Sequence, residues 1–322
     1  MSYKCRKKFA LSSNNHKQLF EIECSYSIAI LNNLIWIVFM FKKNNGFCVL
    51  ILMAILGLHF YANALPNVNK TFIVTGASGE LGGAIARLLA QDNNLILTGR
   101  DSSKLKKLQE ELKAASPNNF EVSTLDFVSD ASRKSFINYL NQNHASIAGL
   151  VLITPRPQFY GKGVWQEENV WLDVIQNTFT GPLEVLKNVV PYLANPSKVV
   201  VIAGTTSIQV QPETGPNGVI RRMWTTYNKI LSHQLGPKGI SINTVSPGVV
   251  MTDFHQKRIQ KKANDDGITY NDQMEKEVAN IPLRRHAKPQ EVAQTVKFLL
   301  SEQSDFINGV NLLLDGGLTL SY

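Results

Sequence analysis

Two rhythms of apolar residues alternate along the chain from Lys70 onward. Short, almost continuous apolar runs are typical of buried strands, and apolar residues at every third or fourth position are typical of helices. The runs predict strands at Phe72–Val74, Leu95–Thr98, Phe120–Leu125, Ile147–Ile153, Lys198–Ala203, Ile240–Val245 and Val310–Leu314. The helical spacing predicts helices at Ala84–Ala90, Ser102–Ala115, Ala131–Leu140, Trp165–Leu193, Val219–Leu235 and Pro289–Leu300. This alternation predicts an α/β fold: a doubly wound parallel sheet of about seven strands with helices on both faces.

The first predicted strand ends in a glycine-rich turn that opens onto a helix. The turn reads Thr75-Gly76-Ala77-Ser78-Gly79-Glu80-Leu81-Gly82. Glycines let the backbone approach a pyrophosphate, and the following helix N-terminus offers unpaired N–H groups and a positive dipole end. The turn therefore predicts a phosphate-binding site. Residues 255–280 are polar and charged, and we expect them to form a mobile excursion over this site.

Charge and cysteine usage narrow the possible functions. The 322 residues carry a net charge of +8, of which residues 1–43 supply +5, so the rest is only mildly basic and carries no nucleic-acid footprint. The three cysteines, Cys5, Cys24 and Cys48, all precede residue 65. This excludes disulfides, thiol catalysis and cysteine-based zinc sites from residues 65–322, and we expect no metal site there.

Residues 40–64 resemble a targeting segment. Lys42 and Lys43 precede an apolar run, Gly46–Phe60, which is followed by Ala62-Asn63-Ala64. This pattern is typical of a secretory signal peptide cleaved after Ala64. The alternative is an uncleaved membrane anchor, although the run is shorter than the roughly 20 residues of a comfortable span. Residues 1–39 form an extension of uncertain status. We expect an exported or membrane-associated protein, with a cytoplasmic protein as the alternative.

Several ordered motifs between Asn69 and Tyr322 resemble the short-chain dehydrogenase/reductase family. They are Thr75-Gly76 with Gly82, Asp126, Asn177, Gly239–Asn243, Ser246-Pro247-Gly248, Thr252, Ile281-Pro282-Leu283 and Asp315-Gly316-Gly317. The resemblance implies a Rossmann-type fold, a nicotinamide cofactor, and hydride transfer to or from a small-molecule carbonyl or alcohol. It also implies a symmetric homodimer or homotetramer, paired through the long helices and the last strand.

The resemblance assigns cofactor contacts to the ends of several strands. The residues concerned are Thr75, Gly76, Ser78, Gly79, Leu81, Gly82, Arg100, Asp126, Pro247, Gly248 and Thr252. An acid in the Gly99 position would bind the ribose 2′-hydroxyl, but that acid is missing and Arg100 can bind a 2′-phosphate instead. This favours NADP(H) over NAD(H). Asp126 either contacts adenine or only forms a turn, and Asn243 matches a structural position.

Two departures from the family pattern affect the cofactor side. Glu80 stands where the family has its second glycine, and a carboxylate beside a pyrophosphate is unfavourable unless it points to solvent. As a first-turn acid it can instead complement the helix dipole. After the fourth strand, Leu152-Ile153-Thr154-Pro155 replaces the family's Asn-Asn-Ala-Gly, and Pro155 and Pro157 stiffen that loop.

The expected catalytic residues depart further. The family's acid/base tyrosine and its lysine fall on Asn217 and Arg221 when counted back from Asn243. Tyr227 does not fit, because its lysine partner would be Leu231, and we expect it to pack within the helix. The serine falls on Thr205, Thr206 or Ser207, while Asn177 in the long helix is retained.

This constellation resembles a divergent branch with asparagine and arginine in place of tyrosine and lysine. An amide cannot exchange a proton near neutral pH, so the proton must come from water, the substrate or another side chain such as Tyr160. We expect an NADP(H)-dependent reductase of a small or acyl carbonyl. The alternative is a catalytically silent dinucleotide-binding sensor or scaffold.

Overall fold

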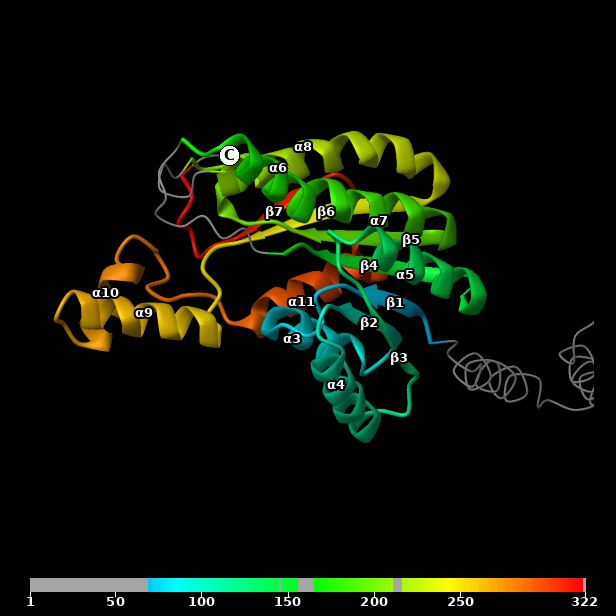
Figure 1. Ribbon diagram of the computed structural model, residues 1–322, viewed down its shortest axis with the longest axis horizontal. Helices are drawn as coiled ribbons and strands as arrows, with labels where there is room; N and C mark the ends of the chain where they lie inside the picture. Colours follow the sequence, from blue (N-terminus) through cyan, green and yellow to red (C-terminus); the bar gives the residue numbers. More distant parts are fainter. Residues whose placement is uncertain (1–68, 145, 156–164, 211–215, 321–322) are drawn as a thin grey trace, which may run out of the picture. The chain divides into compact units, whose positions relative to one another are not determined.

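The computed structural model describes residues 69–144, 146–155, 165–210 and 216–320 (Figure 1). The predictions for residues 1–64, and for Pro157 and Tyr160, lie outside these ranges. Within the described ranges no helix has both the length and the apolar character that a membrane span needs.

The described residues alternate between strand and helix as the sequence predicts. The strands are β1 (Thr71–Val74), β2 (Asn94–Gly99), β3 (Phe120–Thr124), β4 (Ile147–Ile153), β5 (Leu193–Ile202), β6 (Ile240–Pro247) and β7 (Asn311–Leu314). The α-helices are α3 (Glu80–Leu89), α4 (Ser102–Ala115), α5 (Asp130–Asn143), α6 (Glu168–Ile175), α7 (Gly181–Val189), α8 (Pro216–Leu235), α9 (Asp253–Asp265), α10 (Tyr270–Val278) and α11 (Pro289–Leu300). Short 3-10 turns lie at Val190–Tyr192, Thr205–Ser207, Gly236–Lys238 and Glu302–Ser304.

The strands form one sheet in the order β3-β2-β1-β4-β5-β6-β7, and every neighbouring pair is parallel. The predicted doubly wound sheet is therefore confirmed. Because all strands run the same way, their carboxyl ends share one edge of the sheet. The strand order reverses direction between β1 and β4, and such a switch point is where open α/β sheets bind ligands.

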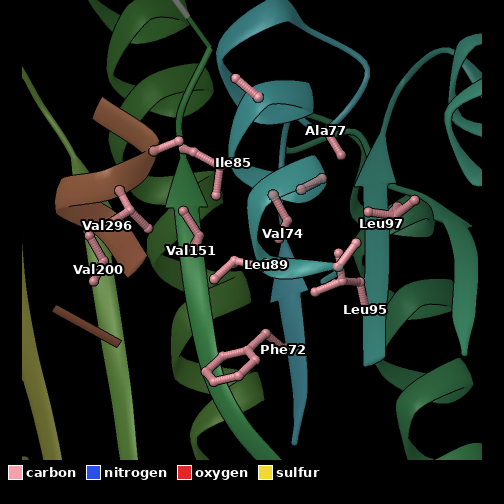
Figure 2. Packing of buried hydrophobic residues seen from close by; sticks show 14 of the residues in the cluster. Phe72, Val74, Ala77, Ile85, Leu89, Leu95, Leu97, Val151, Val200 and Val296 are labelled. Carbon is pink, nitrogen blue, oxygen red and sulfur yellow. The ribbon is translucent and has the colours of Figure 1, made fainter. Parts of the chain in front are cut away.

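Two layers of helices cover the sheet, one on each face. One cluster joins Phe72 and Val74 to α3, α4 and α11, and Figure 2 shows Ile85 and Leu89 of α3 packed over β1 and β4. The other cluster joins Ile73 and Ile96 to α5, α7 and α8. Successive β1 residues thus face opposite layers, as the near-continuous apolar strand predicts.

The long helix predicted at Trp165–Leu193 is interrupted. Its first α-helical residue is Glu168, and Trp165 lies before it with a 95% exposed side chain. A π turn, Gln176–Thr180, separates α6 from α7. Trp224 of α8 donates its indole N–H to the Thr178 carbonyl at 2.8 Å, which fixes the widened turn against α8. Such π turns are frequent at functional sites, and this one contains Asn177.

The segment expected to be a mobile excursion, residues 255–280, instead forms most of α9 and α10. The two helices lie side by side outside the two helical layers (Figure 1). Ile259 and Ala263 bury an apolar stripe on α9, and Arg258 pairs with Glu277 of α10 at 2.8 Å. A capping box at Thr269 starts α10. The stripe is narrow and surrounded by charge, so composition alone hides it.

Candidate functional site

The predicted site residues gather at the carboxyl edge of the sheet because each follows a parallel strand. The glycine turn follows β1, Arg100 follows β2, Asp126 follows β3, and Gly248 follows β6. The first turn of α8 reaches the same edge, since α8 returns from there to the start of β6. The topology thus brings together segments that are up to about 170 residues apart in the sequence.

The glycine turn is shaped by two glycines in particular. Gly76 adopts a φ of +62°, which is rare for residues with a side chain. A Cβ atom on Gly82 would lie 2.2 Å from the Gly76 carbonyl oxygen, whereas one on Gly79 would keep an ordinary 3.4 Å. Gly82 is therefore required for the close approach of α3 to the turn. Leu81 between them packs, partly buried, against the core.

The Thr75 side chain connects the start of the glycine turn to the end of β4. Its hydroxyl is fully buried, accepts the Ile153 N–H at 2.7 Å and lies 3.1 Å from the Ile153 carbonyl. This contact ties the end of β1 to the end of β4. Thr75, predicted as a cofactor residue, thus has its side chain committed to the protein.

At the end of β2, the Ser78 hydroxyl lies close to Gly99, the position that a cofactor-binding acid would occupy. A Cβ on Gly99 would lie 2.8 Å from the Ser78 hydroxyl. Asp101 caps α4 by accepting the Lys104 N–H at 3.0 Å. Arg100 is exposed, and no acidic partner occurs for it among the described residues. The edge beside the turn therefore offers a hydroxyl and a guanidinium, a donor set that suits a phosphate.

The residues that follow β3 and β6 form hydrogen bonds that hold the local backbone in place. The Asp126 carboxylate accepts the Val128 N–H at 3.1 Å, as expected of a turn former. Gly248 donates its N–H to the Leu314 carbonyl at 2.9 Å, next to the buried Pro247. Thr252 is the N-cap residue of α9 and makes no side-chain capping bond.

Asn243 has the structural role that the sequence predicts. Its amide donates to the Ile307 carbonyl at 2.8 Å, and its amide oxygen accepts the Val310 N–H at 3.0 Å. These two bonds join β6 to the segment that leads into β7.

Asn217 lies in the first turn of α8 and is 1% exposed. Neither its amide nitrogen nor its amide oxygen has a hydrogen-bond partner within the described part of the chain. Leaving a buried polar group unpaired costs about 1–3 kcal/mol, so such groups call for a specific explanation. A bound ligand that donates to the amide oxygen and accepts from the amide nitrogen would explain why Asn217 has no protein partner.

Arg221, one turn further along α8, faces the end of β5. It donates from Nη1 to the Thr206 hydroxyl at 2.8 Å. A Cβ on Gly204 would lie 2.8 Å from the central carbon of its guanidinium. The guanidinium therefore occupies the space that a side chain at position 204 would take, and this glycine makes room for it.

Ser246 of β6 and Asn311 of β7 hold the turn after β5 in place. Ser207 and Ser246 hydroxyls lie 3.1 Å apart, Ser246 donates to Asn311 at 2.7 Å, and the Asn311 amide donates to Ser207 at 3.2 Å. The Ser207 hydroxyl is thus engaged within the protein and Thr206 with Arg221. Thr205, also buried, remains the third candidate for the serine position.

Tyr227 packs within its helix layer, as predicted. Its ring meets that of the buried Phe179 edge-on, with centroids 5.9 Å apart. Asn177 is half-buried in the π turn. No cluster of three or more metal-ligating side chains occurs in the portion of the chain that the structure describes.

Glu80, the departure in the glycine turn, reaches across to α9. Its Oε2 accepts the Asp253 N–H at 2.8 Å, joining two segments 173 positions apart. The first-turn acid expected from the sequence is present at the start of α3. Its partner at the start of α9 could not be read from spacing.

Comparison with known proteins agrees with this arrangement. A family model described as enoyl-(acyl carrier protein) reductase matches residues 76–319. Rat dehydrogenase/reductase SDR family member 4 is 28% identical over 256 residues, covering 78% of this chain and 88% of its own length. A 3-oxoacyl-(acyl-carrier-protein) reductase from Rickettsia conorii is 28% identical over 258 residues, covering 78% and 97%.

Among solved structures, L-sorbose reductase from Gluconobacter frateurii, complexed with NADPH and L-sorbose, superimposes with a TM-score of 0.74 at 18% identity. The match covers 79% of this chain and 98% of that one, which establishes the common fold. Together with the family model, these comparisons show that the chain belongs to the short-chain dehydrogenase/reductase family.

Proposed function

We propose that this protein is an NADP(H)-dependent oxidoreductase that reduces a small or acyl carbonyl substrate at an atypical site. The observation that carries the proposal is the unpartnered Asn217 amide, buried at the same sheet edge as the glycine turn. A buried amide without partners suits a site completed by a ligand. The neighbouring turn suits a dinucleotide, and the family supplies the reaction class.

The residues at the edge fit the cofactor. The absence of a Cβ atom on Gly82 lets α3 pack closely on the glycine turn, which brings the start of α3 to the place where the pyrophosphate would bind. Ser78 and Arg100 would hold the 2′-phosphate. When bound, the cofactor supplies or accepts the hydride. The relatives support a reductase, and the name of the Rickettsia protein favours an acyl carbonyl substrate.

Asn217 and Arg221 stabilise charge in this proposal and transfer no proton. The Asn217 amide donates a hydrogen bond to the substrate oxygen. Arg221 stays protonated and lowers the energy of a developing alkoxide. The proton comes from water, the substrate or Tyr160. Thr206 holds the guanidinium at the end of β5 through the 2.8 Å bond described above.

Replacing Asn217 with alanine should lower turnover roughly 100-fold while leaving the NADPH dissociation constant nearly unchanged, since one donor to a developing negative charge is lost. The Arg221→Ala change should weaken NADPH binding about tenfold, because the charge is removed from the edge. Steady-state rates and fluorescence titration measure the two effects separately.

Tyr227→Phe is the matched control, because it keeps the ring on Phe179 and removes only the hydroxyl. Its turnover should equal that of the wild type. A collapse of activity in this variant would mean that the catalytic tyrosine is Tyr227 and that Asn217 has no part in the reaction.

The second candidate function is a silent cofactor sensor or scaffold. The absence of an acid/base side chain at Asn217 favours it. Both functions require NADPH binding, so only turnover separates them. A carbonyl panel without measurable NADPH oxidation, alongside tight binding, would select the sensor.

Assembly through α8 forms part of the proposal. A mainly apolar hollow of about 670 Å³ lies between α8, Phe179 of the π turn and the segment from Thr206 to Val210, and Val219 and Ile230 of α8, which line it, are about half exposed. We expect a symmetric dimer or tetramer, as in the family. Light scattering should give at least a dimeric mass, and Ile230→Glu should lower it. A wild-type monomer throughout the micromolar range would exclude this assembly.

A further inference from the structure

Glu80 occupies a position between two segments that a dinucleotide has to bridge. Its backbone lies in the glycine turn, and its carboxylate accepts the N–H of Asp253, the first residue of α9, at 2.8 Å. In the proposed cofactor site both the glycine turn that opens α3 and Thr252, the N-cap residue of α9, contact the cofactor. The Glu80–Asp253 contact therefore joins two of the segments that would bind the cofactor.

The carboxylate serves two helix N-termini at once. Gly79 is the N-cap residue of α3 and has no side chain. Thr252 is the N-cap residue of α9, and its side chain makes no capping hydrogen bond. The first turn of each helix carries N–H groups without intrahelical partners and a positive dipole end. Glu80 satisfies one of these groups on α9 while its charge also lies in the first turn of α3. A phosphate would be attracted by the same groups.

We propose that Glu80 is an internal competitor for the cofactor. Its carboxylate holds the start of α9 when the site is empty, and the pyrophosphate displaces it on binding. The carboxylate and the pyrophosphate are both negative and repel each other at these helix ends, so the cofactor binds more weakly than the turn alone would allow. This inference rests on the proposed function, because it requires a dinucleotide at the turn.

The Glu80→Gln variant tests the charge alone, because the amide oxygen can still accept the Asp253 N–H. Its dissociation constant for NADPH should be about fivefold lower than that of the wild type at low ionic strength, and the difference should shrink as salt rises. Glu80→Gly removes both the charge and the acceptor. It should show a similar gain in affinity. In cofactor-free Glu80→Gly, the peptide that contains Asp253 should exchange its amide hydrogens faster than the same peptide in the cofactor-free wild type.

The matched control is Glu110→Gln, an equal charge change at an exposed position of α4. It should leave the NADPH dissociation constant unchanged. Unchanged or weaker NADPH binding in both Glu80 variants, with binding by the wild type intact, would overturn the inference. Absence of NADPH binding in the wild type and both variants would overturn the proposed function as well. Binding that appears only when Glu80 is replaced would support both.

Discussion

Replacing Gly82 with alanine should abolish measurable NADPH binding and lower the free energy of unfolding by roughly 3 kcal/mol. The added Cβ would lie 2.2 Å from the Gly76 carbonyl oxygen, and backbone atoms cannot move aside as a flexible side chain can. Either α3 shifts away from the turn or the turn opens, and both changes disrupt the phosphate site. Chemical denaturation and fluorescence titration of NADPH measure the two losses.

Gly79→Ala provides the control within the same turn. Its Cβ would keep 3.4 Å from the Gly76 oxygen, and the residue has a φ of −89°, which alanine adopts easily. We expect stability within about 1 kcal/mol of the wild type, with NADPH binding retained. Equal effects of the two substitutions would show that packing of α3 on the turn does not determine cofactor binding.

Arg100→Ala should raise the dissociation constant for NADPH by roughly 10- to 100-fold, equivalent to about 1–3 kcal/mol, and leave that for NADH unchanged. The 2′-phosphate loses its guanidinium partner, whereas NADH has no group at that position. The wild type has glycine and not an acid at position 99, so the ribose 2′-hydroxyl of NADH finds no carboxylate partner there. Parallel titrations of both cofactors measure the preference.

Arg100→Lys separates charge from geometry at this position. Lysine keeps the charge but cannot form a bidentate pair, so its loss of NADPH affinity should be intermediate. If the wild type binds NADPH and NADH equally, Arg100 is only a solvated side chain at the end of β2, and the assignment of NADP(H) fails.

The sequence was sufficient to predict the sheet because its signals are local and repeated. Strands such as β1 and β4 are almost unbroken apolar runs, and the helix bounds at Ser102–Ala115 and Pro289–Leu300 agree with the structure to the residue. Parallel strands place the residues after them at one edge. The alternation of strands and helices is therefore enough to predict that the glycine turn, Arg100 and Gly248 lie in one region.

Contacts between distant segments could not be predicted in the same way. The bond from Asp253 to Glu80, the fit of Arg221 over Gly204, and the hydroxyl network of Ser207 and Ser246 depend on side-chain placement across turns. Neither periodicity nor spacing encodes such placement. The helices α9 and α10 are hard to predict for another reason. Their apolar stripe is narrow, and many of their residues are charged, as is typical of a loop. Ion pairs between the two helices stabilise these charged residues in helical structure.

Transfer of deuterium from NADPH labelled at C4 of the nicotinamide tests the central claim most directly. The protein would be incubated with labelled cofactor of each C4 stereochemistry and a panel of acyl and small carbonyl substrates, and the alcohol products analysed by mass spectrometry. We predict that one stereoisomer delivers its deuterium to the carbonyl carbon, and that Asn217→Ala slows this transfer roughly 100-fold. Bound NADPH that transfers no deuterium to any carbonyl would contradict the assignment as an oxidoreductase.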